Sequence, residues 1–227
     1  MKWYFDNLFN MLFKPDLFFQ NLPKTLWSED SLTFSMITGW ILAFSITIVV
    51  FINSYFPTGL NLISGIYGNK LIIALPVLLV MGLAFFLMTL FIVAGLIIIA
   101  LLSMFFAGGA AFNFILILLG GSGNIFDTIK ASLFSSGAML IGAINIILMI
   151  AVKYKLMSFS IWILLEKIVF YSGCILLFIL FTVFGIHTHK VPKWKAMLAA
   201  TVPFIVLILF NIVLSSKVLP KLSGFLD

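Results

Sequence analysis

The chain has 227 residues, of which 63% are hydrophobic and only 9% are charged, and its net charge is +6. A soluble globular protein has about a quarter of its residues charged, and a single core of this size cannot enclose so many apolar side chains. The composition therefore excludes that class and predicts an all-α fold, a polytopic transmembrane helical bundle in contact with the lipid bilayer. All basic residues are lysines. Because arginine is favoured where phosphate groups are recognised, no nucleic-acid partner is expected.

Residues 1–27 are expected to form a segment of their own, ahead of a transmembrane domain at 28–227. Their apolar residues follow helical spacing, at Phe5, Leu8, Phe9, Leu12 and Phe13. This pattern predicts an amphipathic helix at the membrane interface, which Pro15 interrupts. Two interpretations stay open, a docking element that lies on the membrane and an apolar flap that packs on the protein's own spans.

Apolar stretches predict five membrane spans, at about 32–56, within 71–119, and at about 128–151, 165–186 and 196–215. The first is expected to end before Pro57. The 49 residues of 71–119 carry no charge, and as one helix they would run about 73 Å against a hydrocarbon core of about 30 Å. This stretch is therefore expected to break, bend or lie partly in the membrane plane, with Pro76 and Gly108-Gly109 as break points. We expect an interfacial or buried segment from residue 71 and then one span that ends near Leu119. The alternative is a hairpin of two spans, which would give six spans in all.

The stretch LLGGSGNIFDTIK, which begins at Leu118, superficially resembles a phosphate-binding loop. Such a loop follows a strand and places a lysine directly after its last glycine. Here Lys130 lies seven residues beyond Gly123 and the preceding element is an apolar helix. No bound nucleotide is therefore expected. The stretch is interpreted as a tight turn, in which Gly120, Gly121 and Gly123 allow positive φ and Asp127 caps the next helix.

Polar residues within the apolar stretches are few. Glu166 and Lys167 form an adjacent pair that is expected near a membrane interface, where lysine can extend to the headgroups. Asn113, Asn145 and Asn211 are interpreted as interhelical hydrogen-bonding residues, or as the lining of one transport path together with Glu166.

The segment HTHKVPKWK, residues 187–195, is expected to be a loop. His187 and His189 lack a nearby third ligand, so no metal site is predicted. The lysines of the loop are candidate interaction residues: Lys190, Lys193 and Lys195. No Ser-His-Asp set, carboxylate pair or intramembrane protease signature is visible, so no catalytic site, no cofactor and no enzymatic activity are expected.

Three segments together resemble the Yip domain family, the Ypt/Rab-interacting membrane proteins, in its bacterial form. FKPDLFFQNLP is similar to the family's Pro-x-x-x-Phe element before the first span, and LLGGSGNIFDTIKASLFSSGAML to its Gly-Gly turn and following span. FGIHTHKVPKWKAMLAATVPF is similar to the family's last loop and final span. The Tyr and Pro that often begin the span after the turn are absent here, where the sequence is FSSGA.

The resemblance implies five spans and a cytoplasmic N-terminus, which the lysine distribution alone does not set. Eukaryotic members are tied to vesicle traffic and Rab GTPases, but bacteria lack Rabs, so that partner does not carry over. We therefore expect a non-enzymatic adaptor or scaffold of the bacterial inner membrane, with a membrane-protein partner or a homo-oligomer. The alternatives are a small-solute or lipid transporter and an accessory subunit of a larger membrane complex.

Overall fold

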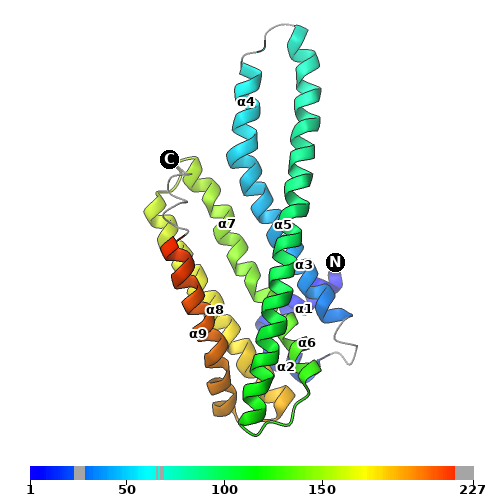
Figure 1. Cartoon of the computed structure of the whole chain (residues 1–227), viewed down its shortest axis with the longest axis vertical. Coiled ribbons are helices and arrows are strands. Elements are labelled where there is room, and N and C mark those ends of the chain that lie inside the picture. The colour runs from blue at the N-terminus through cyan, green and yellow to red at the C-terminus, as the bar shows by residue number, and fades with distance from the viewer. Residues whose placement is uncertain (23–28, 65, 67–68, 218–227) are drawn as a thin grey trace.

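The computed structural model describes residues 1–22, 29–64, 66 and 69–217. Within helices, the description excludes the side chains of residues 69, 71, 206, 207, 210, 211, 213–215 and 217. Every element in the described part of the chain is helical, which confirms the all-α class (Figure 1). The division at residues 27 and 28 stays a prediction, because residues 23–28 lie outside the described part.

The elements follow one another along the chain with short connections. They are α1 (Lys2–Phe13), α2 (Pro15–Gln20), α3 (Asp30–Val50), the π-helical turn η1 (Phe51–Tyr55), α4 (Phe56–Ser64), α5 (Asn69–Leu118), α6 (Ile125–Ser135), the 3₁₀ turn η2 (Ser136–Met139), α7 (Leu140–Lys153), α8 (Phe159–His189) and α9 (Lys193–Lys217).

Four helical stretches of the described chain are long and apolar enough to cross a membrane. They are Asp30–Ser64, Ile72–Leu118, Ile125–Lys153 and Phe159–His189. The predicted span 196–215 lies within the helix α9. A multi-pass membrane protein is therefore well supported, whereas the count of five or six spans stays a prediction.

The prediction that the first span ends before Pro57 is wrong, because the helix continues through α4 to Ser64. Pro57 lies inside this continuous helix, shortly after the π-helical turn η1. A membrane helix tolerates an internal proline where a local π-type adjustment accommodates the missing N–H.

Of the three expectations for 71–119, the break is wrong, since α5 is one helix of 50 residues. A bend or a part in the membrane plane stays a prediction. Pro76 lies inside α5, as membrane helices often allow. Gly109 serves close packing: a Cβ atom there would lie 2.9 Å from Cβ of Ser132 on α6. The two-span hairpin is therefore not formed, and α5 ends at Leu118, near the expected end of the span.

Two helical runs project together beyond the rest of the molecule (Figure 1). We call this projection the arm and define it as η1, α4 and residues 69–90 of α5. Aromatic pairs join its base: Phe51 lies 5.6 Å from Phe86 and Tyr55 stacks at 5.3 Å on Phe85. No described residue of the arm is buried.

The buried core lies at the opposite end, around α6. Residues 128–135 of α6 are all buried, among them Lys130, which is 2% exposed. Phe134 is the centre of an aromatic cluster, with ring centroids 5.2 Å from those of Phe18 and Phe34. This part of α6 is buried on every side and so does not contact lipid; it lies at the centre of the bundle. The 3₁₀ turn η2 then redirects the chain into α7.

The N-terminal segment packs on this core through one face. Tyr4 and Met11 of α1 and Phe18 and Phe19 of α2 are buried. The opposite face of the segment leaves apolar side chains exposed, at Phe5, Phe9, Phe13 and Leu17. The segment thus has the packing expected of a flap and also an apolar outer surface.

Tyr4 fixes α1 to α3 through a buried hydrogen bond. Its hydroxyl lies 2.9 Å from Oγ1 of Thr38, and Thr38 donates its own proton to the carbonyl oxygen of Phe34. Tyr4 is therefore the donor in this pair. Burial raises the pKa of the Tyr4 phenol above its ordinary value, and the bond to Thr38 opposes this in part. Because the folded pKa is the higher one, the contribution of Tyr4 is present below about pH 10 and declines as the pH rises above it.

Removing the Tyr4 hydroxyl tests this attachment. We expect Tyr4→Phe to lower the free energy of unfolding by about 1 kcal/mol, because a buried hydrogen bond is lost while the ring stays in place. Tyr154→Phe, at a residue that is 51% exposed, is the matched control and should leave stability nearly unchanged. Thermal unfolding in mild detergent measures both, and equal midpoints for the two variants would contradict this role.

Candidate functional site

The glycine-rich stretch forms the connection between α5 and α6 at one end of the bundle. The N–H of Gly120 donates to the carbonyl of Ile117 (2.9 Å), and the N–H of Gly121 donates to that of Leu116 (2.8 Å). This is the Schellman pattern that ends helices. Gly120 has φ of +88° and is the one glycine in the described residues with positive φ. The prediction of positive φ at Gly121 and Gly123 is therefore wrong.

Gly121 and Gly123 are instead required by a close approach to the end of α8. A Cβ atom at Gly121 would lie 2.9 Å from Nδ1 of His189, and one at Gly123 would lie 2.5 Å from the carbonyl oxygen of Thr188. The N–H of Ser122 also donates to the carbonyl of His189 (3.3 Å). The turn thus packs directly on the backbone of another helix.

We call the contact between the turn, residues 119–124, and the end of α8 the junction, and His189 lies inside it. His189 is 1% exposed, its Nδ1 accepts the N–H of Gly123 (3.2 Å), and its Nε2 lies 2.8 Å from Oγ1 of Thr128. Because Nδ1 is an acceptor, we assign the proton of a neutral imidazole to Nε2, which donates to Thr128. The Thr128 hydroxyl then donates to Oδ1 of Asn113 or to the carbonyl of Asn124, at 3.2 and 3.0 Å. Residues from α5, α6 and α8 therefore share one buried network.

The prediction that both histidines lie in a loop is wrong, because α8 continues to His189. His187 faces away from the network, and its Nε2 lies 3.4 Å from Oδ1 of Asp16 on α2. The two side chains therefore have different partners. In the part of the chain that the structure describes, no three His, Cys, Asp or Glu residues lie close enough to hold a metal ion.

The lysines of the α8–α9 connection have separate positions. Lys190 ends α8 with φ of 53°, in the left-handed region. Lys195 donates from Nζ to the carbonyl oxygen of Leu119 (2.6 Å) and so closes the end of α5. Its ammonium also lies 5.6 Å from the ring of Trp194. Lys193 is exposed. Three lysines of the α8–α9 connection therefore lie beside the junction at this end of the bundle.

Asn124 is the residue that caps α6, so the assignment of this role to Asp127 is wrong. The side chain of Asn124 accepts the N–H of Phe126 (3.1 Å), and α6 begins at Ile125. Asp127 lies in the first turn of the helix. A carboxylate there still interacts favourably with the helix N-terminus.

Substitutions at these two residues should differ in effect. We expect Asn124→Ala to destabilise the protein by about 1 kcal/mol, because an uncapped N–H remains. Asp127→Asn should cost no more than a few tenths to about 1 kcal/mol, since it removes only a charge near the helix dipole. Chemical denaturation in detergent compares the two variants, and a larger loss for Asp127→Asn would reverse the assignment.

The polar residues that were considered as one transport path lie in different places. Asn113 belongs to the His189 network, whereas Asn145 and Glu166 line a separate cavity of about 160 Å³ between α7 and α8. Oδ1 of Asn145 is buried without a hydrogen-bond partner in the described residues. Lys167 is exposed, and the side chain of Asn211 lies outside the described part. The described residues therefore do not form one continuous polar path.

Sequence reasoning missed Thr128 and Asn124, which complete the junction. Thr128 follows Asn124 by four residues, and this helical spacing was the available signal. Its bond to His189, 61 residues later in the chain, left no local pattern.

A family model described as Yip1 domain matches residues 9–214. The chain belongs to the Yip1 domain family. This confirms the resemblance that the three sequence segments indicated. No curated protein and no solved structure matches the chain significantly. The Yip1 match runs from α1 to α9 and includes the junction, so the network of His189 belongs to a Yip1 domain.

Proposed function

We propose that this Yip1-family protein is a non-enzymatic membrane adaptor or scaffold that acts by binding another membrane protein. The observation that supports this most directly is the uncovered apolar surface of the arm. No described residue of the arm is buried. The exposed apolar residues of the arm include Leu60, Ile73, Val77, Val80, Leu83 and Met88.

The length of α5 is the second argument. The apolar stretch Ile72–Leu118 has 47 residues, which corresponds to about 70 Å of helix. Transmembrane helices tilt by up to about 40°, and at that angle a hydrocarbon core of about 30 Å covers only about 40 Å of helix. Lipid therefore leaves a considerable length of apolar helix uncovered. A protein surface of similar character is the covering that such a patch requires.

The arm has the form of a binding element. Its two helices lie side by side, and most of the large apolar side chains they expose are leucine, isoleucine and valine. We therefore assign the arm to contacts with the helices of a partner, and the bundle around α6 to its support. The membrane is proposed to be the inner membrane of a bacterium, with the N-terminus in the cytoplasm. An accessory subunit of a larger complex would differ from this adaptor only in stoichiometry.

No observation in the described residues favours transport. The residues considered for a transport path lie in two separate places, the His189 network and the cavity at Asn145.

Purification from native membranes tests the adaptor proposal. We expect gentle solubilisation to recover a membrane protein in stoichiometric amount with the wild-type chain. The double variant Val77→Trp/Val80→Trp adds bulk to the arm and should lose this partner. The matched control Ile168→Trp/Ile175→Trp places the same two tryptophans on α8, at residues that are 55% and 56% exposed, and should keep it. Recovery of the chain alone, or equal recovery of the partner with both variants, would contradict the proposal.

A further inference from the structure

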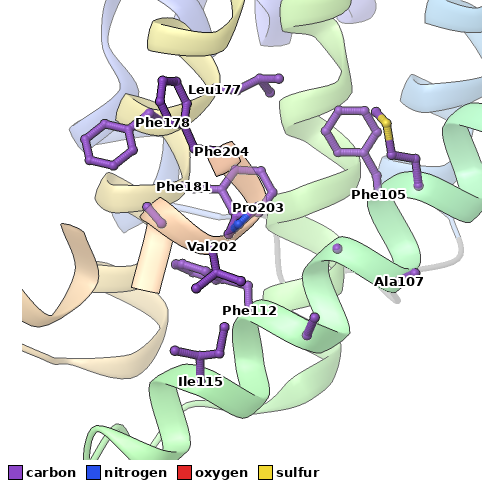
Figure 2. Close-up of a pocket in the computed structure, with 14 residues that line it drawn as sticks. Phe105, Ala107, Phe112, Ile115, Leu177, Phe178, Phe181, Val202, Pro203 and Phe204 are labelled. Atoms are coloured by element: carbon purple, nitrogen blue, oxygen red, sulfur yellow. The ribbon is translucent and has the colours of Figure 1, made fainter. Parts of the chain in front are cut away.

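A second feature of the bundle is an apolar cavity between α5, α8 and α9 (Figure 2). Its volume is about 370 Å³, within the roughly 300–1,000 Å³ of small-molecule sites. Every residue that lines it is apolar, and Figure 2 shows Phe112 and Ile115 of α5 facing Phe181 of α8 and Val202 of α9 across it. The site is independent of the arm, because it lies within the bundle.

The cavity arises from small residues on one face of α5. Gly108 lines it, and no atom lies within 4 Å of the position that a Cβ would take there. Ala107 and Ala111 also line it and leave room for the aromatic rings of α8. The floor is fixed, since the ring of Phe112 lies 5.2 Å from Phe181 and is fully buried. The space is therefore defined by the packing of α5 against α8.

The cavity opens at the side of the bundle. Two of its lining residues, Met104 and Val202, are 37% and 43% exposed. Water does not fill an apolar space of this kind, and an empty one is increasingly unfavourable as its volume grows. An occupant from the surrounding bilayer, a hydrocarbon chain, matches both the lining and the opening.

The end of this cavity lies close to the lysines of the α8–α9 connection. Ile115 in its lining is one helical turn from Leu119, whose carbonyl accepts the bond from Lys195. The segment 187–201 holds three lysines and no Asp or Glu. Lysines near a membrane surface attract anionic headgroups, and an exposed tryptophan such as Trp194 suits the interfacial region. The charge at the junction thus complements an acidic headgroup above a chain held in the cavity.

We propose that the cavity binds one acyl chain of an anionic glycerophospholipid, whose headgroup contacts Lys190 and Lys193. The lipid enters sideways from the bilayer and fills the gap beside Gly108. It thereby joins α5 to α8 and α9 near the junction, where direct packing is incomplete.

Native mass spectrometry of the purified full chain tests the site with two probes, phosphatidylglycerol and phosphatidylcholine of the same acyl chains. We expect one retained phosphatidylglycerol, bound about tenfold more tightly than phosphatidylcholine. Gly108→Phe fills the cavity and should weaken phosphatidylglycerol binding about tenfold or more. Gly95→Phe is the matched control on the same helix, since its Cβ position is also open and it does not line this cavity. Equal binding by both variants would overturn the proposal.

A second variant tests the headgroup contact. Lys190→Gln/Lys193→Gln should remove the preference for phosphatidylglycerol and retain the acyl chain, whereas an unchanged preference would contradict the assigned contact. If Gly108→Phe does not fold, the wild-type protein is crosslinked to a phosphatidylglycerol that carries a photoreactive acyl chain. Its crosslinks should map to residues 104–115 and 177–181. Crosslinks that map only outside these segments would overturn the proposal.

Discussion

His189→Ala is expected to lower the free energy of unfolding by about 2–4 kcal/mol. The N–H of Gly123 loses its acceptor, the hydroxyl of Thr128 loses a donor, and a cavity replaces a ring that is 1% exposed. Because the network joins α5, α6 and α8, the loss should affect the whole bundle. Chemical denaturation in mild detergent measures the effect.

His187→Ala is the matched control, two residues away on the same helix. Its imidazole faces an exposed Asp16 at 3.4 Å, and exposed ion pairs contribute about 0–1 kcal/mol. The control should therefore unfold near the wild-type midpoint. Equal losses for the two histidine variants would show that the buried network does not stabilise the junction.

Gly123→Ala is expected to destabilise the protein by about 1–3 kcal/mol or more, although it adds only one methyl group. The new Cβ would lie 2.5 Å from the carbonyl oxygen of Thr188 and 2.7 Å from Cγ of His189. The first of these is a backbone atom of α8 and has little freedom to move. The turn and α8 are therefore expected to separate, and the hydrogen bonds of His189 to lengthen.

Gly95→Ala supplies the comparison. No atom lies within 4 Å of its Cβ position, and alanine stabilises a helix interior by about 0.5–1 kcal/mol relative to glycine. The two alanine variants should thus change stability in opposite directions. Thermal unfolding of both under one detergent condition tests this, and a stable Gly123→Ala would contradict the close approach at the junction.

The membrane class and the position of the turn could be predicted because both depend on local sequence. Composition alone required a lipid-facing helical protein, and the three glycines lie between two apolar stretches. Their separate roles could not be predicted, because Gly121 and Gly123 pack against the end of α8, which lies more than 60 residues further along the chain. Glycine permits both positive φ and close packing, so the residue type alone does not distinguish them.

The length of α5 and the burial of α6 were missed for a related reason. The thickness of the hydrocarbon core, about 30 Å, predicted a break in 71–119. A helix can nevertheless extend beyond the hydrocarbon core, since its backbone hydrogen bonds do not depend on lipid, and α5 is one continuous helix. In the sequence, α6 resembles the start of the span predicted at 128–151, because Asp127 precedes an apolar stretch. Its position is instead set by contacts such as the bond from Ser132 to the carbonyl of Phe105 on α5 (2.8 Å). Contacts of this kind depend on the tertiary fold.

The proposed adaptor function rests on the arm, and site-specific photocrosslinking in native membranes tests it most directly. A photoreactive residue at Val80 samples the arm, and one at Ile168 samples α8, with exposed fractions of 64% and 55%. We predict that Val80 forms a crosslink to one other membrane protein and that Ile168 does not. Crosslinks from Val80 to lipid alone, or to the same set of proteins as from Ile168, would contradict the assignment of the arm as a partner-binding surface.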